Sequence, residues 1–261
     1  AGEVVALGPG VTGALKINDR VFGIVGGGGY AEYLLTHERM AVPIPANLDF
    51  EAAAAVPEAF ITAHDALETQ GRLLSGERVL IHAVGGGVGS AAVQLAHAMG
   101  CTVFGTSRTL EKLADAKQLG LDVGIDTRHE DFAAIVKAHT NGEGVHVVID
   151  HLGAPALTGN IGALAPLGRL VLVGLLGGSP TSVELGTLMH KRLTIVGTVL
   201  RSRPLEEKIA ATRRFATQVV PWLERGVVRP VIDQVFSLED ARAAQERMAS
   251  NLGFGKVVLR A

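Results

Sequence analysis

A short apolar run, a cluster of glycines and a long apolar-faced helix follow one another in residues 78–99 and restrict the folds open to this chain. Residues 78–84 are mostly apolar and include several β-branched side chains, which is typical of a strand buried in a parallel sheet. The turn that follows consists of Gly85, Gly86, Gly87, Val88 and Gly89. Such a turn lets the backbone approach a pyrophosphate closely, and a helix beginning near Val88 would aim its free N–H groups at those phosphates. The glycines depart from the strict G-x-G-x-x-G spacing, but their place between a strand and a helix predicts a dinucleotide-binding unit.

The end of the second strand of this unit indicates which dinucleotide would bind. Sites that prefer NAD usually carry an acidic residue about 20 residues after the glycines, where it binds the ribose 2′-hydroxyl. Here the strand ends on Thr106, Ser107 and Arg108, and the next acid is Glu111. Arg108 can bind a 2′-phosphate with its forked guanidinium, and Thr106 and Ser107 can donate hydrogen bonds to it. Lys112, one helical turn later, would add a second positive charge.

We therefore predict NADP(H) in preference to NAD(H). A second interpretation stays open, in which Arg108 and Lys112 are solvated charges at the start of a helix.

The composition excludes several other classes of protein. Of the 261 residues, 48% are hydrophobic and 19% are charged, which allows a large core and argues against disorder. The formal net charge of −2 predicts no nucleic-acid partner and no attraction to an anionic membrane. The most apolar stretch, residues 161–178, is interrupted by Pro166 and Arg169, so we expect no membrane span.

Cysteine and histidine usage gives two further expectations. The single cysteine, Cys101, cannot form a disulfide within the chain, which fits a reducing, cytoplasmic setting. The nine histidines have no spacing typical of metal ligands, so no metal site is expected.

Strand and helix patterns alternate from residue 78 to residue 199. Strands are expected at residues 78–84, 101–107, 123–126, 145–150, 169–174 and 193–199. Helices are expected at residues 88–99, 109–119, 130–139, 155–164 and 184–190. Six strands with right-handed crossovers predict an α/β fold, a Rossmann doubly wound parallel six-stranded sheet with helices on both faces.

The flanking regions have different patterns. Residues 1–48 look all-β, with strands expected at Glu3–Leu7, Arg20–Val25 and Tyr30–Leu35. Between the last two lies Gly26–Gly29, which is either a mobile edge of a substrate cleft or a plain hairpin loop. After the sheet we expect helices at residues 206–224 and 238–250 and strands at residues 231–236 and 256–259, with Ser237 as a helix N-cap.

Segments spread over the whole chain carry a family resemblance. They are Gly2–Val5, Asp19–Val21, Gly29–Tyr33, Ala53–Pro57, Thr62–Ala63, Ala83–Gly89, Gly168–Arg169, Val173–Gly174, Lys191–Arg203 and Gly255–Leu259. Together they resemble the zinc-independent quinone oxidoreductases of the medium-chain dehydrogenase/reductase superfamily. The resemblance implies a Rossmann NADP-binding domain of residues 53–200. It also implies a GroES-like β-rich domain made of residues 1–52 and 201–261, from which the N-terminal part of the family's domain is missing.

The same resemblance assigns candidate site residues. Residues 85–89 would carry the pyrophosphate, and Arg108 and Lys112 would meet the 2′-phosphate. Further cofactor contacts are implied for Thr127, Arg128, Gly174, Leu175, Leu200, Arg201, Asn251 and Lys256. The candidate catalytic residue is Thr62, whose hydroxyl would help to orient the nicotinamide. Two alternatives stay open, because Thr62 could be a helix-surface hydroxyl and Asn251 a helix C-cap.

The resemblance also bears on metal and assembly. Glu58 stands where zinc-containing relatives have a cysteine ligand, which favours chemistry without zinc. A homodimer is expected through the sixth Rossmann strand, Leu193–Val199, because an apolar sheet edge usually needs a covering partner.

The preferred function is an NADPH-dependent quinone oxidoreductase that reduces quinones or similar flat acceptors in an interdomain cleft. Two alternatives differ from it in chemistry. One is a 2-enoyl-thioester reductase on the same scaffold, and the other is a non-catalytic NADPH-binding protein with a structural or regulatory role.

Overall fold

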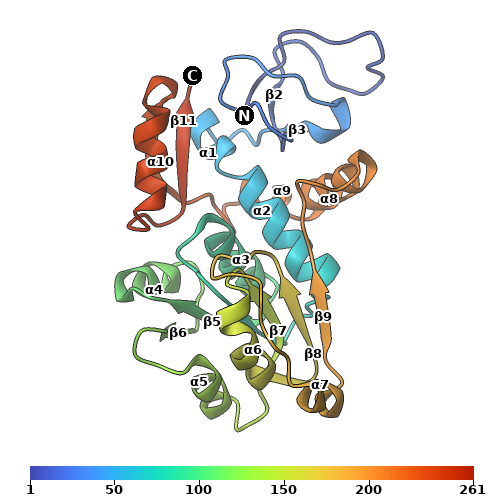
Figure 1. Cartoon of the computed structure of the whole chain (residues 1–261). Helices are drawn as coiled ribbons and strands as arrows, with labels where there is room; N and C mark the ends of the chain where they lie inside the picture. The colour runs from blue at the N-terminus through green and yellow to red at the C-terminus, as the bar shows by residue number, and fades with distance from the viewer. The chain divides into compact units, whose positions relative to one another are not determined.

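The computed structural model describes residues 1–261, which divide into two compact units (Figure 1). One unit consists of Ala1–Thr62 and Leu200–Ala261, and the other of Ala63–Val199. The first unit therefore includes residues 53–62, which the sequence analysis assigns to the Rossmann domain. The boundary falls within helix α2 (Pro57–His64).

The second unit is built on a sheet of six parallel strands. They are β4 (Arg78–Ile81), β5 (Thr102–Ser107), β6 (Val123–Asp126), β7 (Val145–Asp150), β8 (Leu164–Leu172) and β9 (Thr194–Gly197). Their order is β6-β5-β4-β7-β8-β9, and every neighbouring pair is parallel. The order reverses between β4 and β7, as in a doubly wound sheet. The predicted α/β class and strand number are confirmed.

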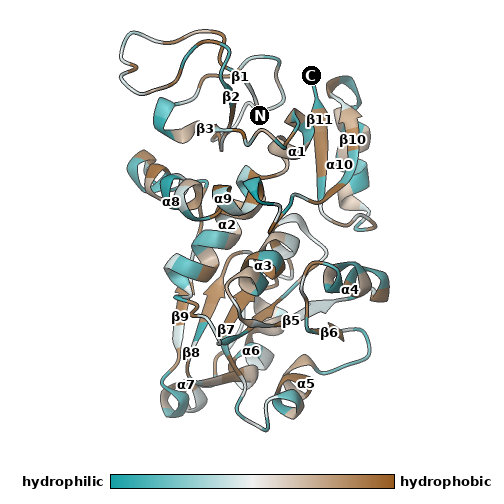
Figure 2. Cartoon of the chain, turned by 180° about the vertical axis from the view of Figure 1, so that it is seen from behind, coloured by the Kyte–Doolittle hydropathy of each residue, from teal (hydrophilic) through white to brown (hydrophobic).

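Helices connect successive strands of this sheet. They are α3 (Gly87–Ala98), α4 (Leu110–Lys117), α5 (Phe132–His139), α6 (Leu157–Ala163) and α7 (Leu185–Lys191), with a 3-10 turn at Ala154–Ala156 directly before α6. A π-helix at Asp65–Gln70 precedes β4. The strands are apolar over most of their length, whereas the helices have mixed hydropathy (Figure 2). Helices α4 and α5 each combine buried and exposed positions, whereas α3 is buried continuously from Gly89 to Ala96.

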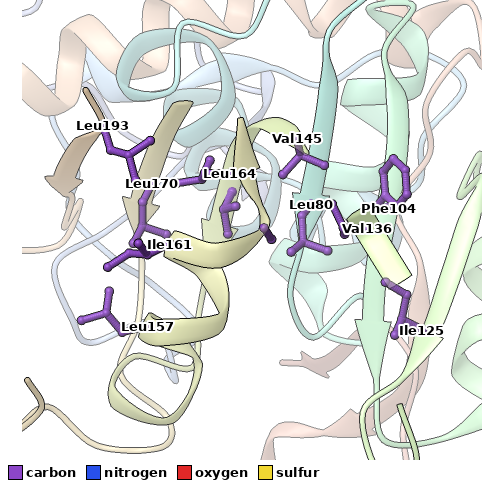
Figure 3. Close-up of a cluster of buried hydrophobic side chains, with 12 residues drawn as sticks. Leu80, Phe104, Ile125, Val136, Val145, Leu157, Ile161, Leu164, Leu170 and Leu193 are labelled. Carbon is purple, nitrogen blue, oxygen red and sulfur yellow. The ribbon is translucent and has the colours of Figure 1, made fainter. Parts of the chain in front are cut away.

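A large apolar cluster fills the space between the sheet and helices α5 and α6 (Figure 3). Leu80, Val148 and Leu170 contribute from three central strands, and Val136 and Ile161 from the two helices. Leu80, Val148 and Leu170 are fully buried. Burial of such side chains stabilises the sheet by about 1.5–3 kcal/mol each, which fixes the positions of the loops at its carboxyl edge.

The N-terminal part of the first unit differs from the prediction. Its antiparallel sheet consists of β1 (Gly2–Glu3), β2 (Arg20–Phe22) and β3 (Val42–Pro43). Tyr30–Leu35 forms no strand, and Leu35 is 98% exposed. The predicted strand there is wrong because alternation alone cannot hold a strand that has neither a pairing partner nor a face to bury.

The C-terminal part of the first unit contains helices and a two-stranded parallel sheet. Its elements are α8 (Leu205–Gln218), α9 (Val220–Glu224), β10 (Ile232–Ser237), α10 (Ala241–Ala249) and β11 (Lys256–Arg260), with a 3-10 turn at Leu238–Asp240. Short helices η1 (Glu38–Met40) and α1 (Phe50–Ala54) belong to the same unit. The single helix expected at residues 206–224 is wrong, because the chain leaves helical register at Val219, just before Pro221. Ser237 is the predicted N-cap, since its Oγ accepts the Asp240 N–H at 3.3 Å.

Candidate dinucleotide site

The glycine turn lies between β4 and α3 and brings backbone unusually close to backbone. Ala83 adopts the left-handed conformation with φ +54°, and the Gly86 N–H donates to its carbonyl at 3.0 Å. A Cβ at Gly89 would overlap that carbonyl and lie only 2.9 Å from Val84 Cα. Helix α3 therefore packs against the turn more tightly than any side chain at position 89 would allow.

The N-terminus of α3 is available to an anion. Its N-cap is Gly86, and no side chain caps the helix. The first-turn N–H groups consequently have no partner within the helix, and the positive end of the helix dipole adds to their attraction for phosphate. A Cβ at Gly85 would meet Lys112 Cδ at 2.5 Å, so the Lys112 stem lies against the turn.

Several of the residues predicted to contact the cofactor lie near the end of β5. Arg108 is exposed, and Ser107 Oγ accepts the Thr109 N–H at 3.1 Å. Thr127 donates to the Ser107 carbonyl with both its N–H, at 3.0 Å, and its hydroxyl, at 3.3 Å. Ser107, Arg108 and Thr127 are therefore neighbours at the carboxyl edge of the sheet.

Arg128 differs from these neighbours because it interacts with an acid. Its backbone N–H donates to Asp126 Oδ1 at 3.0 Å, and its Nε lies 3.5 Å from the same oxygen. The Arg128 N–H, and secondarily the guanidinium charge, hold the pKa of Asp126 below its usual range.

Thr106 departs from the expected phosphate contact. Its side chain is 2% exposed, and its hydroxyl lies 2.8 Å from His82 Nδ1. Successive side chains of a strand point to opposite faces of the sheet. The Thr106 hydroxyl therefore lies on the face opposite to Ser107, against His82.

Thr106 begins a buried polar chain that the sequence analysis missed. His82 Nε2 lies 2.6 Å from Asn160 Oδ1, and Asn160 Nδ2 donates to Asp150 Oδ2 at 3.0 Å. His82, Asn160 and Asp150 are all 0% exposed. The sequence does contain a signal for two of these residues. His82 directly follows the apolar strand β4, and Asp150 ends the apolar strand β7.

The loops after β7 and β8 pair with each other and include the predicted Gly174 and Leu175. Gly174 donates its N–H to the Asp150 carbonyl at 3.2 Å, and Leu176 donates to the His151 carbonyl at 3.0 Å. Gly153, with φ +77°, has no room for a side chain because a Cβ would lie 2.6 Å from the Gly178 carbonyl oxygen and 3.3 Å from Leu175 Cα. These loops are thus held as one layer at the sheet's carboxyl edge.

His151, in the first of these loops, is buried, and its Nε2 has no hydrogen-bond partner. Burial, and secondarily the nearby His82, lower the pKa of His151 to about 4. The imidazole is therefore neutral at physiological pH.

The remaining predicted residues belong to the first unit. The Thr62 hydroxyl on α2 is buried without a hydrogen-bond partner. Leu200 is 9% exposed, and Arg201 is exposed in the turn before α8. Asn251 follows α10 with φ +56°, and Lys256 begins β11, where its N–H donates to the Val231 carbonyl at 2.9 Å.

The first unit also contains an open pocket of about 190 Å³. It is lined by Ile24, Val25, Gly26, Gly27, Leu35, Thr36, His37, Met40, Arg201, Leu205 and Lys208. Part of the Gly26–Gly29 run therefore borders a concave surface in this unit, together with Arg201.

No group of three histidine, cysteine, aspartate or glutamate side chains is arranged to hold a metal ion. Cys101 is 6% exposed, and its Sγ donates to the Leu74 carbonyl at 3.3 Å. None of the helices combines the length and apolar character needed to cross a membrane.

Comparison with known proteins gives a consistent family. Residues 87–218 match the family of zinc-binding dehydrogenases. The quinone oxidoreductase of Pseudomonas aeruginosa is 36% identical over 264 residues, which cover 99% of this chain and 79% of that protein.

Two solved structures bound to NADPH have the same fold. The Escherichia coli quinone oxidoreductase complexed with NADPH is 29% identical, with a TM-score of 0.89, over 100% of this chain and 80% of that one. A mycobacterial protein complexed with NADPH is 28% identical, with a TM-score of 0.90, over the same shares. The glycine turn, the six-stranded sheet and these similarities agree, and the chain belongs to the quinone oxidoreductases of the medium-chain dehydrogenase/reductase superfamily.

Proposed function

We propose that this chain is an NADPH-dependent oxidoreductase that reduces quinones or similar flat electrophilic acceptors. The observation that carries the proposal is the glycine turn at the free N-terminus of α3, with Lys112 packed on Gly85 and Arg108 exposed at the end of β5. An NAD-preferring site would carry an acid near Arg108. The similar proteins from Pseudomonas aeruginosa and Escherichia coli are both named quinone oxidoreductases.

The residues of the second unit have distinct roles in this proposal. The first-turn N–H groups of α3 bind the pyrophosphate, and Gly89 allows the helix to pack against the turn that presents them. Arg108 and Lys112 bind the 2′-phosphate by charge, and Ser107, Thr127 and Arg128 belong to the adenosine end. Gly174 and Leu175 line the nicotinamide end. NADPH, when bound, supplies the hydride, and the protein contributes orientation and electrostatics.

The remaining candidate residues lie in the first unit. We assign to the Thr62 hydroxyl the orientation of the nicotinamide ring, and its buried, unpartnered state supports this because leaving such a group unpaired costs about 1–3 kcal/mol. Leu200, Arg201, Asn251 and Lys256 are assigned to the cofactor's surroundings by family position alone.

We also propose that the chain works without zinc, as a homodimer, in the cytoplasm. Glu58 in place of a cysteine, and a sole cysteine that is buried at position 101, support the first point. The edge position of β9 in the sheet supports the second. The lone, unpaired cysteine supports the third.

The role of Arg108 is tested by the variant Arg108→Ala. We expect its Kd for NADPH to rise about 10- to 100-fold, which corresponds to the loss of a charge-assisted, forked contact. The Kd for NADH should stay within twofold, since NADH carries no 2′-phosphate. Lys117→Ala, which removes an exposed charge from the last turn of α4, is the matched control and should leave both constants unchanged. An unaltered NADPH/NADH ratio in Arg108→Ala would refute the assignment.

A further inference from the structure

The buried polar chain that begins at Thr106 lies where the strand order of the sheet reverses. His82 directly follows β4, Asp150 ends β7, and these two strands are neighbours at the reversal point. Asn160, on α6, lies between them in the chain of hydrogen bonds. All the side chains involved are at most 2% exposed. Buried polar groups are costly unless they are paired, and each of these side chains has a partner in the chain of hydrogen bonds.

Every hydrogen bond in the chain has a defined direction. Asp150 accepts three N–H groups, from Asn160 Nδ2 at 3.0 Å, Leu152 N at 2.6 Å and Gly153 N at 3.1 Å. Because the Asn160 amide nitrogen donates to Asp150, its oxygen is the atom that faces His82 and must accept from it. His82 therefore carries its proton on Nε2, and its bare Nδ1 accepts the Thr106 hydroxyl. One tautomer of one neutral histidine satisfies the whole chain.

The surroundings of His82 keep it in this neutral form. Burial lowers its pKa, and this outweighs the opposing effects of the Asn160 hydrogen bond and the Asp150 charge. His151 is close enough for its own pKa to be lowered by His82, and the Phe132 ring packs edge-on with its centroid 4.9 Å from that of His82.

The two ends of the polar chain are attached to different loops of the cofactor site. At one end, the Thr106 carbonyl accepts the Val84 N–H at 3.1 Å, directly before the glycine turn. At the other end, Asp150 holds residues 152 and 153 through their N–H groups, and its carbonyl accepts from Val173 at 2.8 Å and Gly174 at 3.2 Å. The chain therefore spans from the pyrophosphate turn to the loops assigned to the nicotinamide end.

We propose that Thr106, His82, Asn160 and Asp150 form a positioning relay that fixes the spacing between the pyrophosphate turn and the nicotinamide-end loops. In this proposal none of the four side chains contacts the cofactor. Asp150 acts through the loop whose N–H groups it accepts, and Thr106, His82 and Asn160 act through the hydrogen bonds that connect β5 to Asp150. The relay lets both halves of one dinucleotide bind at once, so that the second half adds its full binding energy to the first. This inference rests on the proposed function, because it concerns the same NADPH site.

A positioning role and a purely structural role of these residues predict different binding of whole NADPH and of a fragment of it. Adenosine 2′,5′-bisphosphate needs only the turn and the end of β5, whereas NADPH needs both ends at the right spacing. In Asn160→Leu we expect the Kd for NADPH to rise about tenfold, a loss of about 1.4 kcal/mol, while the Kd for adenosine 2′,5′-bisphosphate stays within twofold. Isothermal titration calorimetry on the full chain measures both constants.

Thr106→Val is a milder second variant, because it removes one hydroxyl at nearly constant shape. As for Asn160→Leu, the Kd for NADPH should rise while the Kd for adenosine 2′,5′-bisphosphate stays within twofold. Thr106→Ser, which restores the hydroxyl, should recover the wild-type values. The matched control is Thr140→Val. The Thr140 hydroxyl is equally buried and bridges the Val136 carbonyl and the Gly144 N–H, both at 2.8 Å, outside the relay. Thr140→Val should lower the free energy of unfolding without altering the ratio of the Kd values for NADPH and adenosine 2′,5′-bisphosphate.

Three results would overturn the relay. The first is that Asn160→Leu raises the Kd for NADPH and the Kd for adenosine 2′,5′-bisphosphate equally. The second is that Thr140→Val changes the ratio of these two constants as Asn160→Leu does. The third is weaker binding of adenosine 2′,5′-bisphosphate by Thr106→Val, which would show that this hydroxyl binds the phosphate itself. A wild-type chain that binds neither ligand would overturn the proposed function, and this is read separately from the variants.

Discussion

At the scale of single residues, His151 gives the chain a specific sensitivity to acid. The unfolded chain binds a proton at this residue near pH 6.5, whereas burial delays protonation in the folded state until about pH 4. The folded state therefore loses stability as the pH falls from 6.5 towards 4, by about 3 kcal/mol from this group in total. Above pH 6.5 the residue is neutral in both states, and its titration has no effect.

Between pH 7 and pH 4.5 the free energy of unfolding of the wild type should fall. In His151→Leu we predict that this fall is smaller by about 2–3 kcal/mol, because the titrating group is gone. Urea denaturation at the two pH values measures the difference. His190→Leu, at an exposed histidine of α7, is the control and should follow the wild type. Parallel loss of stability in His151→Leu and the wild type would show that His151 titrates normally in the folded state.

The residues of the site divide into those that local sequence predicts and those that it does not. The glycine turn and Arg108 lie within one strand–helix–strand unit, where spacing alone fixes their neighbourhood. Lys112 is predicted to meet the 2′-phosphate, and the structure packs its stem on Gly85, in the same strand–helix–strand unit. The contact between His82 and Asn160 joins residues 78 positions apart, and no local pattern reports it. Thr106 was assigned by its position in the chain, but the pleat of β5 decides which way its hydroxyl points.

At the scale of elements, the contact between α3 and the turn after β4 depends on the absence of a side chain at Gly89. In Gly89→Ala the new Cβ would overlap the Ala83 carbonyl, and backbone atoms cannot move aside as a flexible side chain can. We expect a loss of about 1–3 kcal/mol in the free energy of unfolding, as for other overpacked sites. Gly86→Ala is the matched control, because its Cβ would lie 3.5 Å from the nearest atom, at φ −82°. Denaturation midpoints that are alike in the two variants would contradict the close packing of α3.

The elements of the second unit were predictable because its central strands, such as β4 and β7, are buried on both faces and its strands are bounded by glycine or polar residues. The expected strand at residues 145–150 is reproduced, and that at residues 101–107 differs by one residue. The strand expected at residues 169–174 begins earlier, at Leu164. Residues 1–48 were harder, since β1, β2 and β3 have only two or three residues each and their pairing partners are distant in sequence.

At the scale of the whole molecule, the six-stranded sheet ends at β9, whose outer edge has no partner within the chain. Ile195 and Val196, in the middle of β9, are half-buried and apolar, which favours pairing of this edge with a second copy of the chain. We predict that light scattering at micromolar concentration gives a mass of twice 27.2 kDa. A mass of one chain under these conditions would contradict the proposed homodimer.

The central claim is that this chain oxidises NADPH with a quinone as acceptor. The most direct test follows the absorbance of the reduced nicotinamide after an ortho-quinone is added to the purified chain, with NADH in place of NADPH as one control and an enoyl thioester in place of the quinone as another. We predict quinone-dependent turnover with NADPH and little with NADH or the thioester. Turnover of the thioester without turnover of the quinone, or NADPH binding with no turnover of either acceptor, would contradict the claim.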